Sequence, residues 1–156
     1  MGRLTLEKID AIKDVYTAGI TGFTGERQTL SVTSHFSRRE NNVQAYKTLT
    51  HRHLHEINES LNAVSHSSSA SVHFVPWRGD FTRGIFITSQ LKCPEGIQDI
   101  YKMYHDFYNG HPFVKVSRES IFLKQVVNTN NCFIHIEKEE DNLVVHSTID
   151  NLVKGA

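Results

Sequence analysis

The chain has 156 residues, 38% of them hydrophobic and 22% charged, so it can bury one core and is expected to form a single domain. Lys and Arg total 17, as do Asp and Glu, and this zero net charge argues against a strongly cationic nucleic-acid or membrane binder. MGRLTLEKID contains no long apolar run, so no signal peptide is expected. The chain has only two cysteines, so a disulfide framework is not expected and a cytoplasmic location is predicted.

The first segments predict a helix, a loop and a strand. Leu6, Ile9 and Ile12 follow helical spacing, which predicts a helix from Leu4 to Val15. The glycine-rich TAGITGFTGER predicts a loop, and it lacks the Lys and Ser/Thr of a phosphate-binding P-loop. TLSVTSHF then predicts a strand, and SRRENNVQAYKTLT a polar surface loop.

A second helix is predicted to begin at Thr50 or His51, with Thr50 as its candidate N-cap. Apolar residues spaced three, four and three apart give it a single stripe: Leu54, Ile57, Leu61 and Val64. The polar SHSSSAS that follows predicts a flexible link within the same domain.

The second half is rich in predicted strands: SVHFVPW, RGIFITSQLK, PFVKVS, FLKQVVNTNN, CFIHIEKE and NLVVHSTI. EEDN predicts a hairpin turn between the last two. GIQDIYKMYHDFYNG predicts a helix with Pro94 and Glu95 in its first turn and Gly110 as its C′ residue. This order favours the α+β class, as a two-layer sandwich in which helices cover one face of a mixed or antiparallel sheet.

The segment HRHLHEI places His51, His53 and His55 at alternate positions. A strand would turn all three to one face, as a three-histidine zinc site requires. On the predicted helix they point in different directions and only His51 and His55 are neighbours, which disfavours a metal site. A helix N-terminus lowers a histidine pKa and suits proton transfer near neutral pH, but a solvent-facing helix start without chemistry is the simpler interpretation.

Seven segments occur in a suggestive order: SHF, VQAYKTLTHRHLHEI, HFVPW, TRGIFIT, YNGHPFVKV, NTNNCFIHI and LVVHSTIDNLVKGA. From about Tyr16 to Ala156, the chain resembles the C-terminal domain of the N-acetyl-γ-glutamyl-phosphate reductases, enzymes of arginine biosynthesis. HRHxxEI and IDNLVKGA are the most specific matches. The resemblance implies a fold like the C-terminal domain of glyceraldehyde-3-phosphate dehydrogenase and a homo-oligomer formed through the sheet.

The resemblance also implies a reaction. In the family a cysteine thiolate attacks the acyl phosphate of N-acetylglutamyl 5-phosphate, and NADPH reduces the thioacyl intermediate to the semialdehyde. Residues 1–156 lack both a GxGxxG motif and the matching cysteine. They are therefore expected to be one excised substrate-binding and dimerisation domain, inactive without the NADP-binding Rossmann domain and a C-terminal helix. Cys93 and Cys132 are expected to be packing residues.

The HRHxxE match suggests the catalytic residues. It makes His53 and His51 the candidate acid/base and substrate contact, with His53 preferred as the acid/base, and Glu56 a candidate to orient an imidazole. His55 matches no family catalytic position. Arg52 is a candidate substrate contact, with a solvent-facing side chain as the alternative.

Other candidates come from the remaining motifs. Arg83 is a candidate for substrate binding, with a structural role at a strand edge as the alternative. Because VPWRGDFTRG is longer than the family spacing, Arg78 is a second candidate for the same position. Thr21 replaces a serine of the family's substrate loop, and Asn151 is expected to approach the nicotinamide. Two other functions remain open: a domain of another semialdehyde dehydrogenase, which HRHLHEI argues against, and a histidine-based metal-binding module.

Overall fold

The computed structural model describes residues 14–23, 40–63 and 70–154. In this part of the chain the strands form one seven-stranded sheet, in the order β2-β3-β1-β4-β7-β6-β5. The strands are β1 (Asp14–Thr21), β2 (Gln44–Ala45), β3 (Ser71–Arg78), β4 (Ile85–Lys92), β5 (Val114–Ser117), β6 (Cys132–Glu139) and β7 (Asn142–Ile149). The helices are α3 (His53–Asn62), α4 (Ile97–Tyr108) and the short 3₁₀ helix η3 (Leu123–Gln125).

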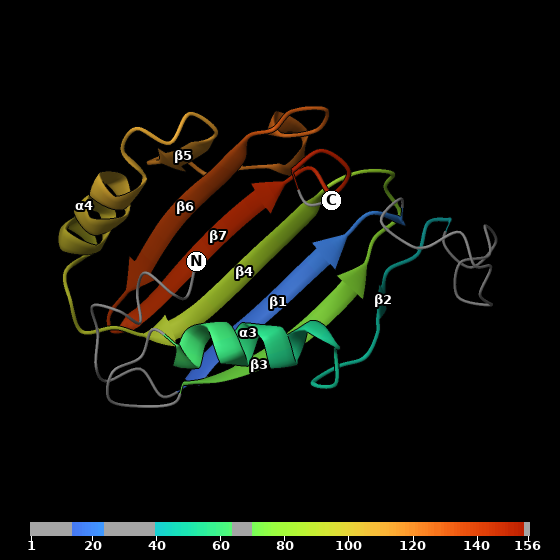
Figure 1. The fold of residues 1–156 in the computed structure, drawn as a ribbon, viewed down its shortest axis with the longest axis horizontal. Coiled ribbons are helices and arrows are strands. Elements are labelled where there is room, and N and C mark those ends of the chain that lie inside the picture. The colour runs from blue at the N-terminus through green and yellow to red at the C-terminus, as the bar shows by residue number, and fades with distance from the viewer. Residues whose placement is uncertain (1–13, 24–39, 64–69, 155–156) are drawn as a thin grey trace.

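The sheet is mixed. β1 pairs in parallel with β3, and β5 with β6, whereas the other pairs are antiparallel. A parallel pair needs a crossover connection, and α3 lies on the connection from β1 to β3. α3 crosses in front of β1 and β3, and α4 lies beside β6 and β5 (Figure 1). The predicted α+β class with helices on one sheet face is confirmed.

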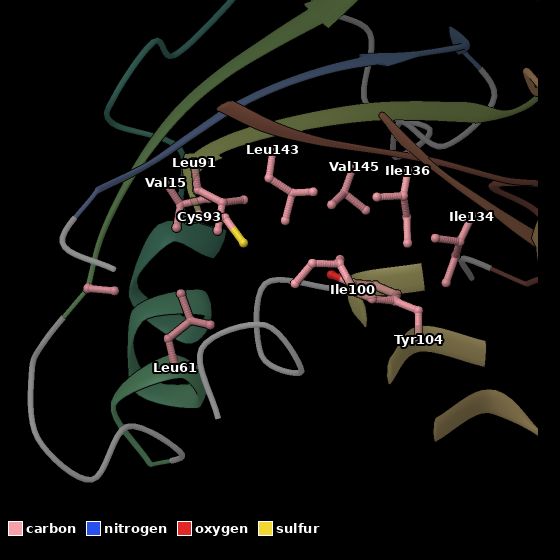
Figure 2. Close-up of a cluster of buried hydrophobic side chains, with 11 residues drawn as sticks. Val15, Leu61, Leu91, Cys93, Ile100, Tyr104, Ile134, Ile136, Leu143 and Val145 are labelled. Carbon is pink, nitrogen blue, oxygen red and sulfur yellow. The ribbon is translucent and has the colours of Figure 1, made fainter. Parts of the chain in front are cut away.

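The core lies between this sheet face and the two described α-helices. Val15, Leu91, Leu143, Val145, Ile136 and Ile134 point from the strands toward Leu61 of α3 and toward Ile100 and Tyr104 of α4 (Figure 2). Leu143 and Tyr104 are fully buried. Each such side chain contributes about 1.5–3 kcal/mol by leaving water, so this face provides most of the stability.

The opposite sheet face carries the alternate residues of the same strands. Strand register aligns Tyr16 with His73 and Gln90, and Ile20 with Trp77 and Phe86. Neither of the two described α-helices covers this face (Figure 2), and the aromatic side chains of Tyr16 and Trp77 are 57% and 38% exposed. We call it the open face.

The glycine-rich start of the chain differs from the prediction. Asp14 and Val15 open β1, so the predicted helix is wrong there, and the rest of that helix lies outside the described residues. The predicted loop from Thr17 is also wrong up to Thr21, because β1 pairs along its length with β3 and β4. Gly19 leaves room for the Phe74 ring to pack against β1, because a Cβ at this position would lie only 3.3 Å from that ring. The predicted strand over residues 29–36 lies outside the described part of the chain.

The second half follows the prediction more closely. Glu139 pairs with Asn142, so EEDN is the expected hairpin turn, with Glu140 at a φ of 50°. Gly110, at a φ of 83°, follows α4 as expected. The first turn of α4 was predicted too early, since the helix begins at Ile97 after an N-cap at Gly96. The predicted strand FLKQVVNTNN is instead η3 followed by turns. Within the described residues, no helix is long and apolar enough to cross a membrane.

Candidate active site

The start of α3 is organised by His51. The helix begins at His53, and its N-cap residue Arg52 makes no side-chain capping bond. The backbone N–H of His53 points instead to Nδ1 of His51 at 3.4 Å, and the N–H of Leu54 donates to the His51 carbonyl at 2.9 Å. The prediction of Thr50 as the N-cap is therefore wrong, because the helix starts later than its apolar spacing suggested.

His51 is half-buried among aromatic rings. Its ring makes edge contacts with Tyr46, Phe74 and His53, at centroid distances of 5.6, 5.5 and 4.8 Å. Burial lowers the pKa of His51 below its ordinary value, and the charges of His53, Lys47 and Arg52 lower it further. His51 is therefore neutral near pH 7. Because its Nδ1 accepts the backbone N–H, its ring proton lies on Nε2.

His53 is exposed and has the opposite hydrogen-bonding character. Its Nε2 accepts a hydrogen bond of 3.2 Å from Nε of Arg52, so this nitrogen carries a lone pair. The two imidazoles thus form a contacting pair in which His51 offers an N–H donor and His53 offers an acceptor nitrogen.

Arg78 and Tyr46 extend this group. The Arg78 guanidinium lies over the Tyr46 ring, with its Cζ 4.2 Å from the ring centroid, and Tyr46 contacts His51. The sequence indicated Arg78 only as an alternative to Arg83, and it did not indicate Tyr46. The only signal for Tyr46 was an aromatic residue five positions before His51.

Thr21 lies beside Arg78 at the end of the sheet, since these two residues pair in register. Alternation along β1 and β3 puts both on the sheet face that α3 covers. The Thr21 hydroxyl donates to the carbonyl of Gly22 at 3.1 Å.

His55 and Glu56 stand apart from the imidazole pair. His55 Nδ1 lies 3.5 Å from the Glu59 carboxylate, one helical turn away. In the described residues Glu56 makes no hydrogen bond or ion pair with His51 or His53. The expected pairing of His51 with His55 was wrong, because His51 precedes the helix and contacts His53. No three His, Cys, Asp or Glu side chains of the described residues are grouped so that they could hold a metal ion.

Arg83 and Asn151 belong to a second group, built around the fully buried Asp150. Arg83 donates through Nη2 to Asp150 Oδ1 at 3.2 Å and through Nη1 to Asn128 Oδ1 at 2.5 Å. Its Nε lies 3.2 Å from Asp150 Oδ2 as an ion pair. The side-chain oxygen of Asn151 accepts the N–H of Gly84 at 2.7 Å. Two residues predicted for ligands therefore anchor the end of β7 to the start of β4.

Asp150 also accepts hydrogen bonds from nearby backbone N–H groups. It accepts the backbone N–H groups of Asn128, Leu152 and Val153 at 2.7, 2.7 and 3.2 Å. Burial by itself raises the pKa of Asp150, but the bonds from Leu152, Asn128 and Arg83 outweigh it and leave the pKa below its ordinary value.

The two groups lie at the same end of the sheet, where β1, β3 and β7 finish (Figure 1). Arg78 ends β3 and Asp150 follows β7, with β1 and β4 between these strands. Three strand spacings separate them by about 14 Å. Tyr46 therefore links Arg78, which lies beside Thr21, to His51 and His53. The backbone bond of 2.9 Å from the Gly22 N–H to the Gly84 carbonyl connects the Thr21 end of β1 to the group of Arg83 and Asn151.

The two cysteines are not activated thiols. Cys93 is fully buried and donates to Glu95 Oε2 at 3.1 Å; burial and this bond raise its pKa to about 11. Burial also raises the pKa of Cys132. Both remain protonated near pH 7, which makes them poor nucleophiles.

The sequence and the fold both match a known class of protein domain. The family described as "Semialdehyde dehydrogenase, dimerisation domain" matches residues 4–151, and the chain belongs to this family. Among solved structures, aspartate semialdehyde dehydrogenase II from Vibrio cholerae complexed with ASA has a TM-score of 0.74 at 9% identity, covering 98% of this chain and 53% of that one. A probable aspartate-semialdehyde dehydrogenase from Pseudomonas aeruginosa has a TM-score of 0.71 at 10% identity, covering 98% and 54%.

Relatives with closer sequences carry a different name. An N-acetyl-γ-glutamyl-phosphate reductase of Phocaeicola vulgatus is 48% identical over 92% of this chain, and one of Parabacteroides distasonis is 46% identical over 92%. The chain spans only 45% and 44% of the length of these two relatives. At 9–10% identity the solved structures support the fold alone, so the reductases are the more informative relatives.

Proposed function

We propose that this chain is the catalytic and dimerisation domain of a cytoplasmic N-acetyl-γ-glutamyl-phosphate reductase. The complete enzyme converts N-acetylglutamyl 5-phosphate to N-acetylglutamate 5-semialdehyde for arginine biosynthesis, with NADPH as reductant and loss of phosphate. Relatives of that name at 46–48% identity support this assignment. The observation that carries it is the contacting pair His51–His53 at the start of α3, with Arg52 bonded to His53 and the Tyr46 ring between His51 and Arg78.

His53 is the acid/base in this proposal. Its Nε2 lone pair can accept the proton of a thiol that attacks the acyl phosphate, and the imidazolium can return a proton later in the reaction. The Arg52–His53 contact is exposed, so a reacting group can replace Arg52 there. The nucleophilic cysteine is contributed from outside this chain.

His51 and the arginines bind the anionic substrate. The Nε2–H of neutral His51 can donate to a carbonyl or phosphate oxygen, and the rings of Tyr46 and Phe74 hold its orientation. Arg78 and Arg52 supply positive charge. Arg78, beside Thr21, is one candidate for the substrate anion. Arg83, held by Asp150 and Asn128, is the other. Glu56 contributes negative charge one turn from His53 and does not orient it directly.

NADP supplies the hydride when it is bound. It would be held mainly by residues outside this chain, which has no GxGxxG motif. Asn151 is the candidate contact from this chain. Its carboxamide oxygen accepts the N–H of Gly84, which fixes the group at the end of the sheet where the other site residues lie.

Self-association of two copies through the open face is also part of the proposal. The family description includes dimerisation, and the open face presents exposed Tyr16 and Trp77 on a broad sheet. Aromatic residues on a flat, accessible surface are typical of protein–protein interfaces.

Substitution of His53 in a full-length reductase that carries this domain tests the catalytic proposal. His53→Ala should lower kcat by about 10²–10⁴-fold, the usual contribution of a general acid/base. The matched control is His55→Ala, since His55 is exposed on the same helix and paired with Glu59, and it should retain near-normal turnover. The 156-residue chain alone should not oxidise NADPH with this substrate.

Circular dichroism would establish that both variants fold. Near-normal turnover of the His53→Ala enzyme would remove His53 from the mechanism. Turnover by the isolated chain would refute the proposal that the nucleophile and most of the cofactor site lie outside it.

A further inference from the structure

A second histidine cluster lies on the open face, away from the candidate active site. It consists of His135 and Glu137 on β6 and His146 on β7, where His135 and His146 are cross-strand partners. Their rings are stacked with centroids 6.2 Å apart. The Glu137 carboxylate spans both, with Oε1 3.2 Å from His135 Nε2 and Oε2 3.5 Å from His146 Nε2. A carboxylate therefore lies between two imidazoles on the surface proposed to meet a second copy.

The hydrogen bonds of His135 require an extra proton in this cluster. Its Nδ1 lies 3.1 Å from the Ser117 carbonyl, and its Nε2 faces the Glu137 carboxylate. A carbonyl oxygen can only accept, and an ionised carboxylate can only accept. A neutral imidazole has one N–H and satisfies one of these partners. Both are satisfied only when the pair His135–Glu137 holds one additional proton.

His146 needs no such proton. Its Nδ1 lies 2.9 Å from the Thr88 hydroxyl, which can donate to it, while an Nε2–H can point to Glu137. The neutral ring therefore suits both neighbours. The bond from His135 lowers the pKa of Glu137; burial opposes this, and His146 lowers the pKa further. Glu137 thus stays a carboxylate well into the acid range.

Three other charged residues near the cluster, Lys115, Glu139 and Lys92, share the open face, and Arg118 directly follows β5 and turns toward α4. Lys115 of β5 is paired with Phe133 and extends over its ring, and Arg118 stacks on Tyr101 of α4. Glu139 and Lys92 lie one side-chain position beyond Glu137 on the same face, each aligned with Asn142. None of these four has a hydrogen bond or ion pair to His135, Glu137 or His146 among the described contacts.

A different histidine–carboxylate pair lies at the other side of the open face. His73 Nε2 is 2.9 Å from Asp14 Oδ1, and the His73 ring stacks on Tyr16. In that pair one N–H satisfies the one acceptor, so the neutral ring suffices. His73 is therefore a suitable control histidine on the same surface.

The extra proton becomes important for stability when the cluster is buried. Glu137 is 54% exposed in the single chain, so water can compensate it when the proton is absent. A second copy over the open face would remove that water. The proton-bearing pair has no net charge, whereas loss of the proton would leave a buried carboxylate facing a ring lone pair.

We propose that the His135–Glu137–His146 cluster makes self-association through the open face proton-dependent, with tighter association at lower pH. This inference rests on the self-association included in the proposed function. Association takes up protons in this scheme, so the dissociation constant rises as pH rises.

Sedimentation equilibrium of the 156-residue chain between pH 6 and pH 8 tests the proposal. The dissociation constant should increase at least about tenfold over this range, since uptake of one proton on association allows a change of up to about tenfold per pH unit. Glu137→Gln should abolish the dependence. The amide introduced by this substitution can donate to a neutral His135 Nε2, so the cluster is satisfied without the extra proton.

Two matched variants complete the experiment. Glu139→Gln removes a neighbouring carboxylate of β6, and His73→Gln removes the other histidine pair; both should keep the wild-type pH dependence. A chain that associates equally well at pH 6 and pH 8, or a Glu137→Gln variant with the wild-type slope, overturns this inference and leaves self-association standing. A chain that stays monomeric at both pH values up to about 100 μM overturns both.

Discussion

The two faces of the sheet are made from the same strands and have opposite character. The face covered by α3 and α4 carries aliphatic residues such as Leu91 and Leu143, each less than a twentieth exposed. On the open face Tyr16 and Trp77 reach solvent, and histidines bond to carboxylates. Because side chains alternate along a strand, neighbouring residues point to different faces and have different roles. One face stabilises the domain, and the other is available for association.

The largest expected loss of stability comes from a substitution in β7. Leu143 and Val144 are adjacent in this strand and point to opposite faces of the sheet. Leu143 is fully buried, so Leu143→Ala should lower the free energy of unfolding by about 3 kcal/mol. Val144→Ala on the half-buried open side should cost about 1 kcal/mol. Urea denaturation at a fixed low protein concentration measures both. Equal losses would mean that both faces are core, which would contradict the comparison.

An intermediate effect is expected at the end of the sheet, where Asp150 belongs to neither face. Asp150→Ala leaves Arg83 and three backbone N–H groups without their acceptor. The loss should be about 2–3 kcal/mol, slightly below that for a fully buried ion pair, because Arg83 remains partly solvated.

We also expect the stabilisation from Asp150 to depend on pH. The pKa of Asp150 is lower in the folded chain than its ordinary value, so its stabilisation is present above about pH 4 and is lost as pH falls through the folded pKa. Denaturation at pH 6 and pH 3 should therefore show a smaller acid-induced loss in Asp150→Ala than in the wild type. An identical acid-induced loss in both proteins would contradict the assignment of this carboxylate.

The smallest effect on the folded chain is expected on the open face itself. Tyr16→Ala should change the free energy of unfolding by less than about 1 kcal/mol. It should weaken self-association about tenfold or more, because Tyr16 is 57% exposed on the open face and stacks on His73 there. Phe107→Ala on α4 is the control, since Phe107 is 51% exposed but lies away from the sheet. A similar change in the dissociation constant for both variants would argue against the open face as the contact.

The accuracy of the sequence-based prediction differed along the chain for a physical reason. Alternating or helical apolar patterns indicate β6, β7 and α4, as do turn residues such as Gly110. β1 has glycine and threonine where a strand pattern would show large apolar residues. It is a strand because β3 and β4 supply partners for its backbone on both sides.

The sequence provides candidate site residues but does not show how they are arranged in space. The motif HRHxxE identified His51 and His53, and the structure brings their rings into contact. The partners of Arg83 could not be predicted, because Asp150 is 67 residues away and meets Arg83 only through the pairing of β4 with β7. The same limit applied to Arg78 and Tyr46, which come together where the chain before α3 runs along β3.

The sequence by itself determined the class of the fold, most of the strands of the second half and the motif at the start of α3, because local periodicity and residue type encode these features. The tertiary structure decided which charged groups face each histidine. His51 and His53 lie among arginines and a lysine, whereas His135 and His146 share a glutamate. A histidine's protonation depends on the charges and hydrogen-bond partners within a few ångströms, and strand pairing sets these.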